Sequence, residues 1–133
     1  MEQTYQIRMP YIGGVLSDNS YKFLSKATKP IVTIWKRELA QKAEALNVPK
    51  AESYEIRLFG RFTDERRPDL SNLHKVIGDS LKKTHQWLGL GVDDKLFRFV
   101  DEGYDLGVME SELVITVVPD IIVVGKEEDG STN

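Results

Sequence analysis

Cysteine is absent from this chain of 133 residues, and histidine occurs only at His74 and His85. The absence of cysteine excludes disulfide frameworks, zinc–thiolate sites, iron–sulfur clusters and cysteine nucleophiles. Two histidines are too few for a histidine-rich metal site. On one helix they would also lie about 16 Å apart, which is too far to share an ion. Both fall at the border of an apolar helix face, which favours partly buried, structural side chains.

Long apolar runs are also missing. No apolar segment reaches the roughly 18 residues of a membrane span, and the first four residues, Met-Glu-Gln-Thr, lack the basic and apolar regions of a signal peptide. We therefore expect a soluble, cytoplasmic protein with no membrane partner. The length, with 41% apolar and 29% charged residues, predicts a single domain over residues 1–125. Residues 126–133 form a polar tail that we expect to be disordered.

The net charge of −3 is distributed unevenly along the chain. Residues 1–50 have a net charge of +4, residues 51–83 of +1 and residues 84–133 of −8. This asymmetry allows a basic surface to coexist with an acidic one, so the overall negative charge does not exclude a nucleic-acid partner. Solvated acidic surface would explain the same distribution, and charge alone does not decide between the two.

Hydrophobic periodicity predicts an α/β (α+β) fold: a mixed sheet of about four to five strands with two main helices packed on it. Apolar residues alternate with polar ones in the predicted strands and recur every three or four positions in the predicted helices. Glycines 89 and 91 are expected to end the second helix, and residues 101–103 to form a turn. The order is β-α-β-α-β-β, with strands at 4–9, 54–58, 96–100 and 112–118 (with 121–124 as an extension), helices at about 30–46 and 69–87, and a long loop at 11–29.

Residues 66–94 hold the most informative pattern. Asp69 stands at the start of the second predicted helix, and Asn72, Lys75 and Asp79 form a polar line opposite its apolar face. An acidic pair at 93–94 follows a glycine-rich turn. Each feature also has a structural explanation, because Asp69 can cap the helix, Asp79 can pair with neighbouring lysines and the acidic pair can be solvated.

The combination of these features resembles the RusA family of Holliday junction resolvases. These are small, homodimeric, Mg²⁺-dependent endonucleases that nick branched DNA symmetrically. The resemblance is carried by two segments: Arg66-Arg67-Pro68-Asp69-Leu70-Ser71-Asn72-Leu73, continued by Lys75 and Asp79-Ser80-Leu81, and then Gly91-Val92-Asp93-Asp94. The predicted order of strands and helices also fits, so the resemblance spans most of the chain.

The resemblance implies a role for individual residues. Asp69 and Asp94 match metal-binding and catalytic aspartates, and Lys75 matches the catalytic lysine. Asn72 and Asp79 match supporting positions of the helix. Mg²⁺ is the implied cofactor, with Mn²⁺ as a substitute, and we expect the two aspartates to meet at a single cation.

The sequence departs from the family at one position. The usual Asp-Leu-Asp-Asn segment has Ser71 in place of the middle aspartate. A hydroxyl can bind Mg²⁺ but adds no charge, so the metal should bind more weakly unless Asp93 or another acid compensates. Ser71 and Asp93 are therefore additional candidate ligands, and a DNA-binding protein without catalytic activity stays open as an alternative.

Basic residues supply a candidate surface for the DNA backbone. The alternative is that these side chains only increase solubility. The candidates are Lys22, Lys26 and Lys29 in the loop, Lys36 and Arg37 in the first helix, and Arg66 and Arg67 before the second helix.

Taken together, the sequence predicts a homodimeric, Mg²⁺-dependent endodeoxyribonuclease that resolves four-way DNA junctions by paired nicks in recombination or repair. Three alternatives remain. One is a non-catalytic protein that binds branched DNA, and another is a small metal-dependent phosphoesterase or ligand-binding domain that does not act on DNA. The third is an interaction module in which Asp69 and Asp94 are only helix caps.

Overall fold

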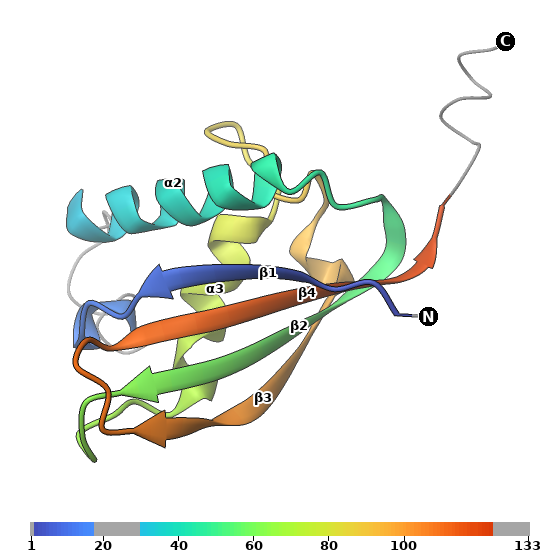
Figure 1. Ribbon diagram of the computed structural model, residues 1–133. Coiled ribbons are helices and arrows are strands. Elements are labelled where there is room, and N and C mark those ends of the chain that lie inside the picture. Colours follow the sequence, from blue (N-terminus) through green and yellow to red (C-terminus); the bar gives the residue numbers. More distant parts are fainter. Residues whose placement is uncertain (1, 18–29, 124–133) are drawn as a thin grey trace, which may run out of the picture.

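The computed structural model describes residues 2–17 and 30–123, which form one four-stranded mixed sheet with helices on one face (Figure 1). The spatial order of the strands is β1-β4-β2-β3. Strand β4 pairs antiparallel with both β1 and β2, whereas β3 pairs parallel to β2 at the sheet edge. The predicted fold class is confirmed. The strands are β1 (Tyr5–Pro10), β2 (Ala51–Phe62), β3 (Phe97–Leu106) and β4 (Glu112–Ile122).

Two α-helices and three short 3₁₀ turns complete the described part of the chain. The two helices contact each other, and α2 also packs against β1. Most of the predicted loop at 11–29 and the whole predicted tail at 126–133 lie outside the described residues. The helices are α2 (Pro30–Ala45) and α3 (His74–Leu81), and the 3₁₀ turns are η1 (Gly14–Leu16), η2 (Leu70–Leu73) and η3 (Asp94–Leu96).

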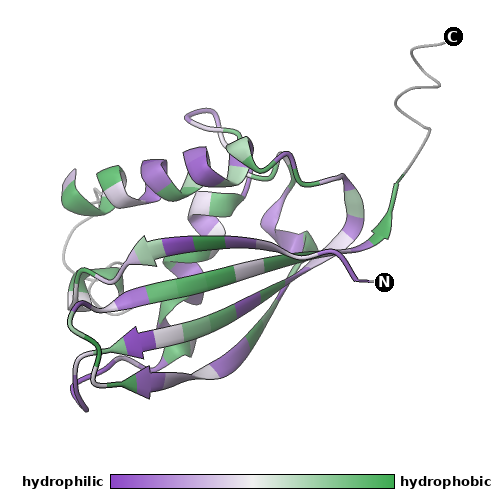
Figure 2. Cartoon of the chain, viewed as in Figure 1, coloured by the Kyte–Doolittle hydropathy of each residue, from purple (hydrophilic) through white to green (hydrophobic). Residues whose placement is uncertain are grey.

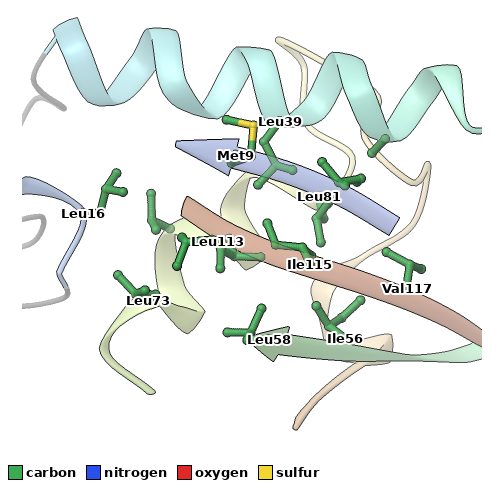
Figure 3. Close-up of a cluster of buried hydrophobic side chains, with 14 of the residues drawn as sticks. Met9, Leu16, Leu39, Ile56, Leu58, Leu73, Leu81, Leu113, Ile115 and Val117 are labelled. Atoms are coloured by element: carbon green, nitrogen blue, oxygen red, sulfur yellow. The ribbon is translucent and has the colours of Figure 1, made fainter. Parts of the chain in front are cut away.

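The core lies between the sheet and the two helices (Figure 3). Alternate residues of β2 and β4 point to the same face, and these are the apolar ones, such as Ile56 and Ile115, both fully buried. Leu39 from α2 and Leu81 from α3 close the core from the other side. The same alternation is visible in the hydropathy of the strands (Figure 2).

The opposite face of the sheet carries arginines and glutamates that pair with one another. Arg8 and Arg61 both contact Glu112, at 2.7 and 3.1 Å. Arg57 and Arg98 likewise contact a glutamate on β2, Glu55. Because each of these arginines has a carboxylate partner, they do not give this face an excess of positive charge.

The second predicted helix is too long at its C-terminal end. Helix α3 ends at Leu81, because Lys82 adopts an extended backbone with φ −80° and ψ 156°. The chain then folds back, and the Leu90 N–H donates to the Leu81 carbonyl at 2.7 Å. His85 therefore lies beyond the helix and is exposed, so its predicted partial burial is wrong.

The predicted turn at 101–103 is also wrong, because these residues belong to β3. Asp101 pairs with Leu58 and Tyr104 with Gly60, so β3 has one residue more than β2 over this stretch. This is a β-bulge, and Gly103 accommodates it with φ +111°.

Candidate metal and DNA-binding site

Asp69 stands where the chain enters η2. Its backbone is extended, with φ −74° and ψ 132°, and its side chain makes no capping hydrogen bond. The residue is exposed, and among the described residues none pairs with its carboxylate. The alternative in which Asp69 serves as a side-chain cap is thus not what the structure shows. Ser71, two residues on, is also exposed, and Asn72 is half-buried.

Asp93 and Asp94 begin η3, just before the edge strand β3. Asp93 caps this turn, since its side chain accepts a 2.9 Å hydrogen bond from the Lys95 N–H. That bond, together with one to Asp94, lowers the pKa of Asp93. The Asp94 carboxylate instead faces Lys82, whose Nζ lies 3.6 Å from Asp94 Oδ2.

The structure does not bring Asp69 and Asp94 together within one chain. Asp69 precedes η2, whereas Asp94 contacts Lys82, the residue that follows α3. The eight residues of α3 alone span about 12 Å along the helix axis. In Figure 1, α3 crosses behind the sheet and its two ends lie apart.

The oxygen ligands at either end fit Mg²⁺ in kind but not in number. Ser71 and Asn72 follow Asp69 closely in the chain and add only neutral oxygens, and Lys82 offsets the charge of Asp94. Within residues 2–17 and 30–123, no three His, Asp or Glu side chains are grouped so as to hold a metal ion. Among these residues, either end therefore offers fewer than three such side chains, and water, substrate phosphates or a carboxylate of another chain would complete the coordination of Mg²⁺.

Asp79 is the centre of a cluster of lysines between α2 and α3. Its side chain is only 14% exposed, and its oxygens lie 3.4 Å from Lys75 Nζ and 3.3 Å from Lys82 Nζ. Lys36 of α2 joins the cluster. Burial, with smaller contributions from Lys75 and Lys82, lowers its pKa, and Asp79 opposes this effect. Asp79 thus interacts with Lys36 of α2, and Lys82 extends the cluster to Asp94 at the start of η3.

These contacts change how the lysines are interpreted. Lys36 interacts with Asp79, and its Nζ lies 5.7 Å from the ring centroid of Trp87. Its ammonium group therefore already interacts with groups of the protein. Lys75 keeps a side chain that is 46% exposed, and it remains available to a ligand on the outer side of α3. Arg37 is exposed on α2. Lys22, Lys26 and Lys29 lie outside the described residues.

His74 is partly buried, as predicted, but its contacts with β3 were not predicted from the sequence. His74 Nε2 and Asp101 Oδ1 are hydrogen-bonded at 2.8 Å, and the imidazole stacks on Phe99 with ring centroids 4.4 Å apart. The alternation of a strand continued to residue 101 would have placed Phe99 and Asp101 on one face. This signal was missed because Asp101 was predicted to begin a turn, whereas β3 continues to Leu106.

Among the described residues, no helix is long and apolar enough to span a membrane. The arrangement supplies a carboxylate at the start of η2 that pairs with no described residue, a lysine cluster around Asp79 and an acid–lysine pair at η3. A scan against protein-family models finds no match to this chain, and a search of curated proteins finds none either.

Proposed function

We propose that this protein is a homodimeric, Mg²⁺-dependent endonuclease that cleaves branched DNA, with four-way junctions as its substrate. The motif from Arg66 to Asp94 supports this reaction, because carboxylates and a lysine are the side chains suited to phosphodiester hydrolysis, and here Lys75 lies on α3 while Asp69 and Asp94 lie beyond its two ends. Bound Mg²⁺ would supply an activated water and offset the charge that develops on the phosphoryl oxygens.

The observation that carries the proposal is the state of Asp69. A carboxylate at the start of a helical segment normally caps it or pairs with a cation. Asp69 does neither with any described residue, although Arg67 precedes it closely and Lys75 follows on α3. An exposed acid kept apart from nearby cations is available to bind a metal ion.

The separation of Asp69 from Asp94 supports a homodimer in which both chains build each site. If α3 of a second copy lay antiparallel to α3 of the first, Asp94 of each copy would approach Asp69 of the other. A two-fold symmetric pair would then have two equivalent sites, which suits paired nicks on a two-fold substrate.

The first experiment compares a synthetic four-way junction with a duplex of equal length, each incubated with the protein and Mg²⁺ or Mn²⁺. We expect symmetric nicks in the junction only, and their loss in Asp69→Asn and Asp94→Asn. Tight junction binding without cleavage under either ion would indicate the non-catalytic alternative. Metal-dependent hydrolysis of a simple phosphodiester with no affinity for DNA would indicate the phosphoesterase.

A mixing experiment tests the shared site. Asp69→Asn and Asp94→Asn are each inactive alone, but a mixed dimer contains one site with both aspartates. We expect the mixture to recover single-strand nicking of the junction, up to about a quarter of the wild-type rate if chains pair at random. No recovery, despite exchange of chains shown by a tagged subunit, would contradict the shared site.

A further inference from the structure

Arg66 and Arg67 are adjacent in the sequence but differ in their surroundings. Arg66 is bound by Asp64, which accepts two side-chain hydrogen bonds at 2.7 and 3.2 Å and one from the Arg66 N–H at 2.9 Å. These bonds lower the pKa of Asp64 to about 2. Arg67 has no carboxylate partner among the described residues. Its positive charge is therefore not neutralised.

The guanidinium of Arg67 lies over an aromatic ring. Its Cζ is 3.7 Å from the ring centroid of Tyr104, and Nη1 donates a long, 3.4 Å hydrogen bond to the Pro68 carbonyl. The Nε is buried, and no described residue accepts a hydrogen bond from it. Within the described part of the chain, the five N–H groups of this guanidinium thus make one weak hydrogen bond, although such groups normally find acceptors.

The bulge in β3 is what brings Tyr104 to this place. Leu58 faces the helices, and so do its partner Asp101 and the next inward residue of β2, Gly60. Without the extra residue in β3, Gly103 would pair with Gly60 and Tyr104 would point to the opposite face. The bulge therefore turns the Tyr104 ring toward the segment that carries Arg67 and Asp69.

We propose that Arg67, held on the Tyr104 ring, binds a phosphate of the DNA strand beside Asp69, and that Tyr104 is its positioning residue. This inference rests on the proposed function. Stacking fixes the plane of the guanidinium and leaves its edge for a phosphate, which accepts two parallel N–H bonds. An arginine adjacent to the metal-binding aspartate would place the strand for hydrolysis, whereas Arg66 would contribute little.

Junction binding measured without hydrolysis tests whether Arg67 holds a phosphate. Affinity for a four-way junction is determined in EDTA over a series of salt concentrations for the wild type, Arg67→Gln and Arg66→Gln. We expect Arg67→Gln to weaken binding about tenfold at 0.1 M salt and to make the salt dependence shallower by about 0.9 for each phosphate that is no longer neutralised. Arg66→Gln, the matched control, should stay within about twofold of the wild type.

Cleavage kinetics test the role of the ring. Tyr104→Phe keeps the aromatic face, so it should retain most of the wild-type kcat as the conservative variant. Tyr104→Ser removes it and should lower kcat for the junction about tenfold, because a misplaced strand reacts slowly even when bound. Arg67→Lys keeps the charge but not the planar fork, so it should recover affinity without recovering kcat. Thermal melting of every variant shows whether a loss is due to unfolding.

The outcomes separate this inference from the proposed function. If the wild type cleaves junctions but Arg67→Gln behaves like Arg66→Gln, the assignment of a phosphate to Arg67 is wrong and the nuclease stands. If Tyr104→Phe and Tyr104→Ser have equal kinetics, the positioning role is wrong. If the wild type neither binds nor cleaves a junction, the proposed function fails and this inference fails with it.

Discussion

Lys82 lies between two acids and joins Asp94 to Asp79. Its Nζ is 3.6 Å from Asp94 Oδ2 and 3.3 Å from Asp79 Oδ1. Partial burial lowers the pKa of Lys82, but the charges and hydrogen bonds of Asp79 and Asp94 together outweigh this effect and raise it. In the single chain, Asp94, one of the two aspartates predicted to bind the metal, is therefore already paired with Lys82.

The Lys82→Gln variant tests whether this pairing competes with metal. A divalent cation at Asp94 must displace the ammonium or share the carboxylate with it. We expect Lys82→Gln to bind Mn²⁺ about three- to tenfold more tightly, because like charge near the site is removed. Isothermal titration with Mn²⁺ measures the change, and Lys83→Gln, an exposed neighbour, is the control. Weaker Mn²⁺ binding by Lys82→Gln would contradict competition.

Replacing Ser71 with aspartate should strengthen metal binding at Asp69, near the N-terminal end of α3. Ser71 is exposed in η2, two residues after Asp69, and Ser71→Asp adds a second carboxylate there. We expect Mn²⁺ affinity to rise about tenfold and junction cleavage to rise at limiting metal. Ser71→Asn controls for side-chain size. Equal Mn²⁺ affinities for the Asp and Asn variants would show that residue 71 does not face the metal.

The elements with strong periodicity were predictable from the sequence. The first helix and the strands around Ile56 and Ile115 bury apolar residues on the core side, as at Leu39, although Ile31 and Ile34 of the helix are exposed. The boundary at Leu81 was not predictable, because the helical pattern continues toward Leu88 while the helix end depends on a tertiary contact. Periodicity reports which face is buried, not where a chain reverses.

The site was predictable in its residue types but not in its geometry. The axial rise of a helix already separates Asp69 from Asp79. The position of Asp94 depends on how residues 82–93 fold back, and no local pattern encodes that path. The bulge at Gly103 was hidden for a similar reason. Asp101-Glu102-Gly103 has the composition of a turn, and only pairing with β2 keeps it in the sheet.

The contact that ends α3 can be tested at Gly89. This glycine has φ +56°, and a Cβ at this position would lie 2.3 Å from the Leu81 carbonyl oxygen. We expect Gly89→Ala to lower the free energy of unfolding by about 2 kcal/mol or more, from backbone strain and displaced packing. Urea denaturation measures this change. Gly14→Ala is the control, since nothing lies within 4 Å of a Cβ there; equal stabilities would refute the contact.

The lysine cluster predicts a second effect on stability. Asp79→Asn removes the charge that holds Lys36, Lys75 and Lys82 near one another, and the three ammonium groups then repel. We expect the free energy of unfolding to fall by about 1–3 kcal/mol, because the side chain is only 14% exposed. Lys75→Gln removes a more exposed partner and should cost less than about 1 kcal/mol. An Asp79→Asn variant as stable as the wild type would mean that the cluster is not stabilising.

A glutamate on the sheet face opposite the helices, Glu55, predicts how stability depends on pH. Hydrogen bonding from Arg57 is the main cause that lowers the pKa of Glu55 below its ordinary value of 4.5, against the effect of burial. A carboxyl whose pKa is lower in the folded state stabilises the fold above pH 4.5, and this contribution is lost as the pH falls through the lowered value. Glu55→Gln should therefore melt below the wild type at pH 7, and the difference should shrink as the solution is acidified below pH 4.5.

Glu52→Gln, on the same strand and exposed, is the control. A difference in melting temperature that stays constant from neutral to strongly acidic solution would show that the Glu55 charge is not its source.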